Sequence, residues 1–506
     1  MDNLTKNFSG LRAVLFPIHR EEISRFLPMG LMMFFVVFNY TILRDTKDTL
    51  VVNAAGAEAL SLIKLFGTVP GAIVVLLVYA KLSVLFSKKM LFYVTLTPFI
   101  LFFSLFAYFI YPFEVNLHPS AETVTQLTEA YPRFKTFFLV YGSWSYALFY
   151  VFSELWGSVV LSLLFWQFAN DFVPIQEAKR FYPLFGMIAN FGAVAAGLCI
   201  QYFSQMRDTV PGGIDPWGKT LDYLMGAVAI GGLMIMVIYG LLNHYVVDKQ
   251  PTQAKPKKQK IKMSLTDSFK FLIRSSHLGY IALIVICYGI SQNMIEAVWK
   301  DQIKKVYLNE NAYNAFMGQF STINGLVTIF FMFIGSNVVR LFGWKISAML
   351  TPIMILFTGI LFFSFINFKD HFELYTLSLL SMTPTVLAVW IGFSQNSLSK
   401  STKYSLFDPT KEMSYIPLDQ ESKIKGKAAV DVVGGRLGKS GGSLIQQILL
   451  LTTGSTLVGV SPYLGIMVCL CVFVWLIAIK KLSKSLTELH SEAEEKTANF
   501  PLAVKG

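Results

Sequence analysis

Long apolar runs recur along the whole chain, and they constrain its fold more than any other feature of the sequence. A helix that crosses a bilayer needs about 20 mostly apolar residues. Runs of this kind lie near 26–43, 59–85, 90–112, 136–170, 181–204, 221–246, 278–298, 314–340, 345–368, 373–397, 429–452 and 460–481. The pattern predicts an all-α integral membrane protein with about twelve transmembrane helices. The run at 136–170 is long enough to contain a further boundary.

The composition agrees with a membrane protein and excludes a set of soluble domains. Hydrophobic residues make up 54% of the 506 residues and charged residues 15%, whereas soluble chains carry about 25% charged residues. The net charge of +12 lies largely in short segments between the apolar runs. Such a distribution reflects membrane topology, and we expect no nucleic-acid partner.

The basic residues also predict an orientation. With twelve spans, the termini and the loops on their side carry about thirty Lys and Arg residues, and the opposite loops about ten. Because positively charged loops remain in the cytoplasm, we expect both termini inside, with tails at 1–25 and 482–506. The N-terminal residues show neither a signal peptide nor a transit peptide. These features favour a bacterial cytoplasmic (inner) membrane over a plastid envelope.

A polar, Lys- and Pro-rich segment at 247–277 divides the chain into halves at 26–246 and 278–481. A solvated cytoplasmic linker is the simplest interpretation, and lipid or partner binding is a secondary one. The halves resemble each other: Thr-Pro recurs at 97–98 and 351–352, and Phe-Ser-Glu at 152–154 matches Phe-Ser-Gln at 393–395. Parallel six-helix repeats predict a major-facilitator-like 6+6 bundle with pseudo-twofold symmetry.

Charged residues inside apolar runs are costly and usually face a cavity or a partner. The clearest cases are Lys64, Glu154, Glu296, Arg436, Lys439 and the segment Arg44-Asp45-Thr46-Lys47-Asp48. Each has a structural alternative. Lys64 is close enough to a boundary to snorkel, Glu296 is near Trp299, a candidate interfacial anchor, and Arg44 has the spacing to pair with Asp48.

The segment GGRLGKSGG at 434–442 resembles a phosphate-binding P-loop, but it fails the test. Only three residues separate Gly434 from Gly438, where the motif needs four, and the glycines continue into an apolar helix. Small residues at this density let helices approach closely. The four cysteines and six histidines show no metal-ligand spacing, and we expect no catalytic residue, metal or cofactor.

Long stretches of the sequence carry a family resemblance. They read FNYTILRDTKDTLVV (38–52), FSELWGSVVLSLLFWQFAN (152–170), EAKRFYPLFGMIAN (177–190), YGISQNMIEAVWK (288–300), KYSLFDPTKEMSYIPLD (403–419) and KGKAAVDVVGGRLGKSGGSLIQQ (425–447). The chain resembles the ATP/ADP translocases of plastids and obligate intracellular bacteria, a nucleotide transporter family unrelated to the mitochondrial carriers. The resemblance implies a secondary transporter that exchanges external ATP for internal ADP, with phosphate accompanying ADP. It also implies that Lys64, Glu154, Glu296 and Lys439 are needed for transport.

The expected mechanism is alternating access about a midplane site. Lys64 and Lys439, with Arg44, Lys47 and Arg436, would neutralise the polyphosphate, and the glutamates would pair with these cations in the empty state. Asn293 could bind base or ribose, or link two helices. Adenine stacking on Tyr40, Tyr288 or Phe185 is less favoured than core packing.

Three alternatives stay open at this point. The first is a related transporter that imports nucleotides with protons or carries NAD or GTP, the second a membrane ATPase, and the third a scaffold without transport. The partners that we expect are ATP, ADP, phosphate and the lipid bilayer, with no nucleic acid, and the usual unit of this architecture is a monomer.

Overall fold

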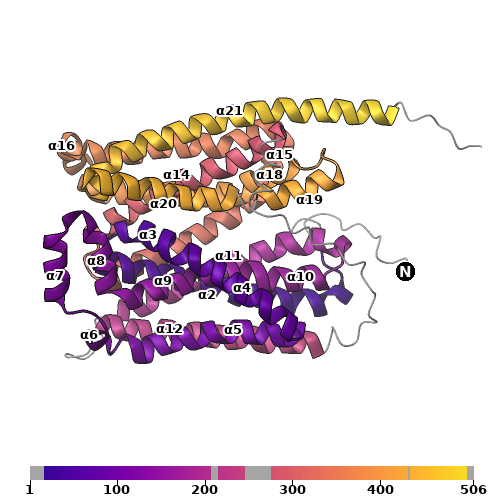
Figure 1. Cartoon of the computed structure of the whole chain (residues 1–506). Helices are drawn as coiled ribbons and strands as arrows, with labels where there is room; N and C mark the ends of the chain where they lie inside the picture. The colour runs from indigo at the N-terminus through magenta and orange to yellow at the C-terminus, as the bar shows by residue number, and fades with distance from the viewer. Residues whose placement is uncertain (1–15, 207–214, 245–274, 431–433, 499–506) are drawn as a thin grey trace, which may run out of the picture. The chain divides into compact units, whose positions relative to one another are not determined.

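The computed structural model describes residues 16–206, 215–244, 275–430 and 434–498, and helices make up nearly all of this part of the chain (Figure 1). Most of the predicted linker and the outer part of each predicted tail lie outside the described residues. Contacts group the chain into unit 1, residues 1–254 and 307–329, and unit 2, residues 255–306 and 330–506. This grouping follows contacts and not repeats, so the predicted half boundaries stay a prediction.

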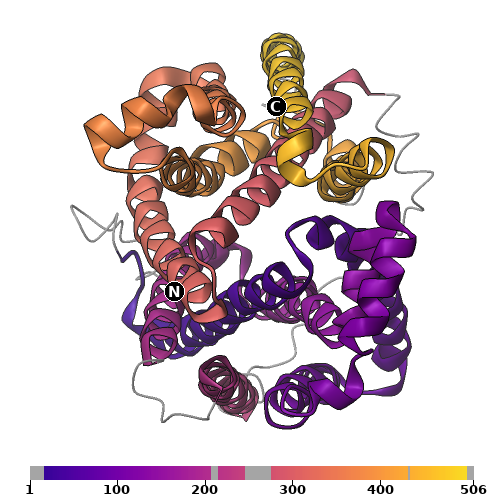
Figure 2. The same cartoon turned by 90° about the vertical axis from the view of Figure 1, so that its left-hand side faces the viewer.

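Unit 1 contains α2 (Ile23–Ala55), α3 (Glu58–Ile63), α4 (Val69–Leu85), α5 (Lys88–Leu105), α6 (Glu114–Leu117), α7 (Ala121–Ala130), α8 (Lys135–Gly142), α9 (Trp144–Trp156), α10 (Trp166–Phe172), α11 (Ile175–Gln205) and α12 (Pro216–Leu242). The long helices run along a common direction, as the end-on view in Figure 2 shows, whereas α7 lies across that direction in Figure 1. Short 3₁₀ turns cover Arg20–Glu22 and Pro132–Phe134, and π-helical segments cover η2 (Lys64–Thr68), η3 (Phe106–Ile110) and η5 (Gly157–Phe165).

Unit 2 contains α14 (Ser276–Val306), α16 (Lys369–Leu380), α17 (Pro384–Thr402), α18 (Asp408–Met413), α19 (Gln420–Ala429), α20 (Gly435–Thr453) and α21 (Leu457–Ala498), with the π-helical segment η8 (Lys403–Phe407). The long α15 (Glu310–Asn367) begins in unit 1 and continues in unit 2. It is two helices joined at Gly343, whose φ of 74° suits a residue without Cβ.

The prediction of a helical membrane bundle is confirmed. Among the described residues, ten helices are long and apolar enough to cross a membrane, or eleven if one bent pair counts as a single span. The bent pair corrects the predicted continuous run at 373–397, because α16 ends at Leu380 and the next helix starts at Pro384 with an 84° change of direction. The run at 136–170 does contain a further boundary, since non-helical Ser143 separates α8 from α9.

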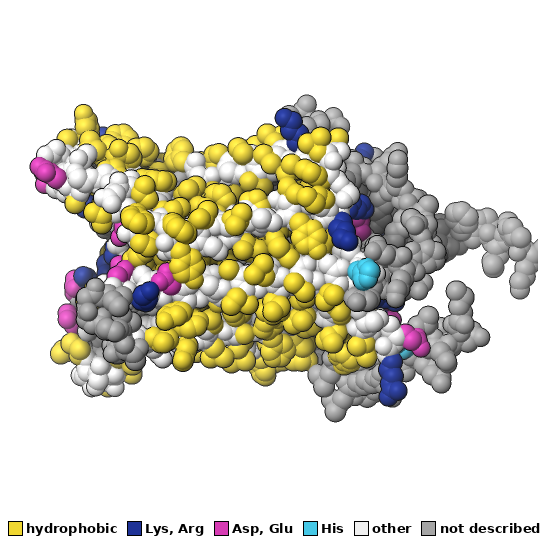
Figure 3. Space-filling model, turned by 90° about the horizontal axis from the view of Figure 1, so that it is seen from below, with side chains coloured by type: hydrophobic (Ala, Val, Ile, Leu, Met, Phe, Trp, Pro, Cys, Tyr) yellow, Lys and Arg dark blue, Asp and Glu magenta, His cyan; other side chains and the backbone are white. Residues whose placement is uncertain are grey.

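The outer surface of the helices is apolar. In the span Glu58–Leu85, only 11% of the most apolar stretch is buried, and Leu77, Val84 and Leu85 are exposed. Figure 3 shows a face whose middle is covered by hydrophobic side chains, while the charged side chains in view lie toward the helix ends. Apolar surface of this extent suits contact with lipid tails.

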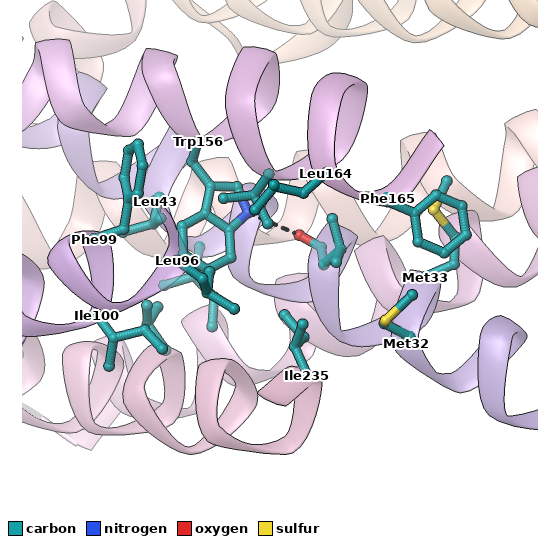
Figure 4. Packing of buried hydrophobic residues seen from close by; sticks show 14 of the residues in the cluster. Met32, Met33, Leu43, Leu96, Phe99, Ile100, Trp156, Leu164, Phe165 and Ile235 are labelled. Atoms are coloured by element: carbon teal, nitrogen blue, oxygen red, sulfur yellow. Dashed lines mark hydrogen bonds between the residues drawn. The ribbon is translucent and has the colours of Figure 1, made fainter. Parts of the chain in front are cut away.

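The core of unit 1 packs α2 against α9, η5, α11 and α12, and α5 packs against α12 and α9. Trp156 is fully buried in it and donates from Nε1 to the carbonyl oxygen of Val36 at 3.1 Å (Figure 4). Phe99 and Phe103 meet the indole edge-on. A buried indole usually finds such a partner, and this bond fixes α9 against α2 two residues after Glu154.

A group of acidic and aromatic residues lies at one end of unit 1, where Glu114 follows the span Lys88–Ile110. Tyr146 donates a short hydrogen bond to Glu114, and Tyr111 donates to Asp215 Oδ2 at 2.8 Å. Burial raises the pKa of Glu114, the bond from Tyr146 opposes this effect, and the charges of Asp215 and Glu310 add to it. Glu114 therefore holds its proton more tightly than an ordinary glutamate.

Candidate functional site

Lys47 and Glu154 form an ion pair inside unit 1, between α2 and α9. The Lys47 Nζ lies 3.0 Å from Glu154 Oε1 and 2.8 Å from Asp48 Oδ1. It also sits 3.8 Å above the centre of the Tyr150 ring. The Lys47 side chain is only 3% exposed, whereas that of Glu154 is 23% exposed. A buried ammonium is thus compensated by two carboxylates and a ring face, and one of the carboxylates remains accessible.

Arg44 belongs to a second polar group, between α2 and the first part of α15. Its Nε lies 3.0 Å from Asp45 Oδ1, and its Nη2 donates to Ser321 Oγ at 2.7 Å. Ser321 in turn donates a short hydrogen bond to Asp45. Asp48, which the helical spacing suggested as the partner of Arg44, pairs with Lys47. The segment 44–48 therefore carries two separate pairs within one helix.

Glu296 lies between two lysines of unit 2. Its Oε1 is 3.2 Å from Nζ of Lys300, one turn later on α14, and 3.6 Å from Nζ of Lys400 on α17. The side chains of Glu296 and Lys400 are 21% and 18% exposed, and that of Lys300 is 3% exposed. Trp299 is fully buried and donates to the carbonyl oxygen of Val389 at 2.9 Å. It packs inside unit 2, which excludes the interfacial-anchor alternative.

Neutral polar side chains continue this group along α14. Gln292 donates to Asn396 Oδ1 at 2.6 Å and accepts from Ser399 Oγ at 2.6 Å, so α14 and α17 are also joined one turn before Glu296. Asn293 is buried, its Oδ1 accepts a long bond from Ser443 at 3.5 Å, and its carbonyl oxygen accepts from Gln446 at 3.2 Å. Asn293 therefore links α14 with α20, as the structural alternative predicted.

The remaining predicted residues have different environments. Lys64 is half-buried and begins the π-helical segment η2, a type of segment that occurs often at functional sites. The side chains of Arg436 and Lys439 lie outside the described residues. Of the candidate stacking rings, Phe185 is fully buried against Phe26, and Tyr288 stacks on Phe407 with centroids 5.3 Å apart. Both rings pack against their own unit.

The glycine-rich segment that resembles a P-loop lies at a helix contact. Residues 435–453 form α20, which packs against α14. A Cβ built on Gly289 would lie 2.8 Å from Cα of Gly438, so the two backbones touch there. Gly434 and Gly442 continue the same contact against α14. The glycines serve helix packing, as their density predicted.

Two lysines of the site were missed in the sequence. Lys300 carried a usable signal, because it follows Glu296 by four residues on a predicted helix. Lys400 follows the apolar run predicted at 373–397, and it lies within α17, which ends at Thr402. Its partner is 104 residues away in the chain, and no local pattern indicates that pairing.

The chain is similar to known proteins over nearly its whole length. Residues 1–486 match the family model described as TLC ATP/ADP transporter. ADP,ATP carrier protein 1 of Chlamydia muridarum is 48% identical over 99% of this chain and 96% of its own length. The chloroplastic ADP,ATP carrier protein 1 of Arabidopsis thaliana is 45% identical over 95% of this chain and 77% of its own length. ADP,ATP carrier protein 1 of Rickettsia bellii is 42% identical over 96% of this chain and 98% of its own length.

Solved structures resemble the chain in fold alone. A bacterial homologue of the iron transporter ferroportin in its inward-facing state has a TM-score of 0.56 at 13% identity, over 92% of this chain and 100% of its own. The nucleoside transporter NupG has a TM-score of 0.54 at 11% identity, over 89% and 99%. The fold is the one that these structures share, major-facilitator-like, and the family match and the named carriers make the protein a transporter and not an enzyme. The match over nearly the whole chain, with relatives at more than 40% identity, places this chain in the TLC ATP/ADP transporter family.

Proposed function

We propose that the protein exchanges ATP for ADP across a membrane by alternating access, with ATP imported and phosphate accompanying ADP. The relatives named ADP,ATP carriers, which match almost the entire chain, support this substrate pair. The observation that carries the proposal is the accessible glutamate paired with buried lysine in each unit. Nucleotides are polyanions, so a protein that carries them through an apolar bundle needs cations there.

The ion pairs explain how such cations are tolerated when no nucleotide is bound. A single buried lysine without a counter-charge would cost several kcal/mol, about 3–5 when one partner of a buried pair is removed. Glu154 supplies part of that counter-charge for Lys47, and Glu296 does so in unit 2. We assign Lys64 and Lys439, with Arg44, Lys47 and Arg436, to neutralisation of the polyphosphate, and Glu154 and Glu296 to compensation of the cations.

The distribution of basic residues in the sequence supports an orientation of the protein in its membrane. We place the protein as a monomer in a bacterial cytoplasmic membrane with both termini in the cytoplasm. The relatives in Chlamydia and Rickettsia support a bacterial setting, and the chloroplastic relatives make a plastid envelope the alternative. Cysteine labelling of residues 120 and 498 from either side of intact cells tests the orientation, since only residue 120 should react from outside.

Uptake by proteoliposomes tests the exchange. Radiolabelled ATP should enter vesicles preloaded with ADP and should not enter empty vesicles, and an uncoupler should leave the rate unchanged. Unlabelled ADP should compete, whereas GTP and NAD should compete weakly. Equal uptake into empty vesicles, or loss of uptake with the uncoupler, would instead establish proton-coupled net import. Vesicles without protein are the background.

A further inference from the structure

The two accessible glutamates belong to ion-pair clusters of opposite composition. In unit 1, the cluster is one lysine with two carboxylates: Lys47, Asp48 and Glu154. In unit 2, it is one carboxylate with two lysines: Glu296, Lys300 and Lys400. Unit 2 thus places two ammonium groups around one carboxylate, and positive charge of this kind attracts a polyanionic substrate.

Within the cluster of unit 2, the two lysines are not equivalent. Lys300 is nearly completely buried, lies on the same helix as Glu296 and makes the shorter contact, at 3.2 Å. Lys400 comes from α17, is 18% exposed and makes the longer contact, at 3.6 Å. An incoming anion can therefore reach Lys400, whose contact with Glu296 is weaker than that of Lys300.

We propose that Lys400 binds the phosphate groups of the nucleotide, and that its contact with Glu296 breaks when it does so. Lys300 is a positioning residue that keeps Glu296 on α14 while Lys400 is engaged with substrate. When the nucleotide leaves, Lys400 pairs with Glu296 again. This inference rests on the proposed function, because it names a binding residue for the same substrate.

In this mechanism Glu296 and the phosphate groups of the nucleotide compete for Lys400. Replacement of Lys400 and replacement of Glu296 should therefore change nucleotide affinity in opposite directions. Replacing Lys400 by Gln removes a charged contact worth about 1.5–3 kcal/mol, which corresponds to about 10- to 150-fold weaker binding of ATP and ADP. Replacing Glu296 by Gln removes the competing carboxylate, so ATP should bind more tightly while exchange becomes slower. A residue that only maintained the fold would not tighten binding when it is replaced.

The test measures equilibrium binding of radiolabelled ATP and ADP to purified protein, separately from exchange in proteoliposomes. Lys400→Gln should bind both nucleotides at least tenfold more weakly, and Lys400→Arg, which keeps the charge, should stay within about threefold of wild type. The matched control is Lys305→Gln, at the exposed end of α14, where Lys305 pairs with Asp301. It should bind nucleotide as wild type does.

Two results would overturn the proposal. One is ATP affinity within twofold of wild type in folded Lys400→Gln protein. The other is Glu296→Gln protein that binds ATP more weakly than wild type, a result that does not depend on how Lys400→Gln folds. Wild-type protein that binds ATP but does not exchange it for ADP would overturn the proposed function and leave the assignment of Lys400 standing.

Discussion

Replacement of Lys47 by methionine tests how the cluster of unit 1 is held together. The Lys47 and Asp48 side chains are 3% and 1% exposed, so their pair is shielded from water. Removal of one partner of a buried pair costs about 3–5 kcal/mol, because the other charge stays buried without compensation. Glu154 is partly exposed, and its share of the pairing is worth only about 0–1 kcal/mol.

We therefore expect Lys47→Met to lower the free energy of unfolding by about 3–5 kcal/mol, and Glu154→Gln by no more than about 1 kcal/mol. The double variant Lys47→Met/Asp48→Asn removes the uncompensated carboxylate and should recover about 2–3 kcal/mol. Denaturant titration in detergent micelles, followed by circular dichroism of the helices, measures all three. A Lys47→Met protein within 1 kcal/mol of wild type, or a double variant less stable than the single one, would refute this account of the pair.

Three further predictions concern transport and pH. Glu154→Gln should reduce ATP–ADP exchange at least tenfold while circular dichroism shows the wild-type helix content, and wild-type exchange in this variant would remove Glu154 from the mechanism. Lys439→Gln should weaken binding of ATP and ADP about tenfold in an equilibrium assay, and unchanged affinity would exclude contact with phosphate. Because the pKa of Glu114 is raised in the folded protein, wild type should lose stability as pH rises from about 4.3, the usual carboxyl value, through the raised one. Glu114→Gln should lack this loss in unfolding midpoints measured across pH, and identical pH profiles would contradict the role of burial.

Features set by short-range patterns could be predicted from the sequence. Apolar length identified the membrane helices, and the cost of buried charge selected Glu154 and Glu296, which the structure shows in ion pairs with lysine. The helix start at Pro384 also carried a local signal that was overlooked. Thr383 caps the helix by accepting from the backbone N–H of Val386, and Pro384 occupies the first turn.

Features that depend on tertiary contact could not be predicted in this way. The partners of Glu296 include a lysine from another helix, and Lys400 looks like any basic residue that follows an apolar run. The order of the repeats in the sequence likewise does not indicate that residues 307–329 group with unit 1. Hydropathy reports which residues avoid water, and carries no information about which helix they meet.

The contact between Gly289 and Gly438 has a mechanical consequence. Where helices interlock through side chains, one can move past the other only in jumps, since each side chain must leave one gap and enter the next. At Gly289 and Gly438 no side chain lies between the two backbones, so a small displacement of α20 along α14 has no interlocked side chains to disengage at that point. The bonds from Ser443 and Gln446 to Asn293 limit the displacement, and a bulky residue at either glycine would force the two helices apart.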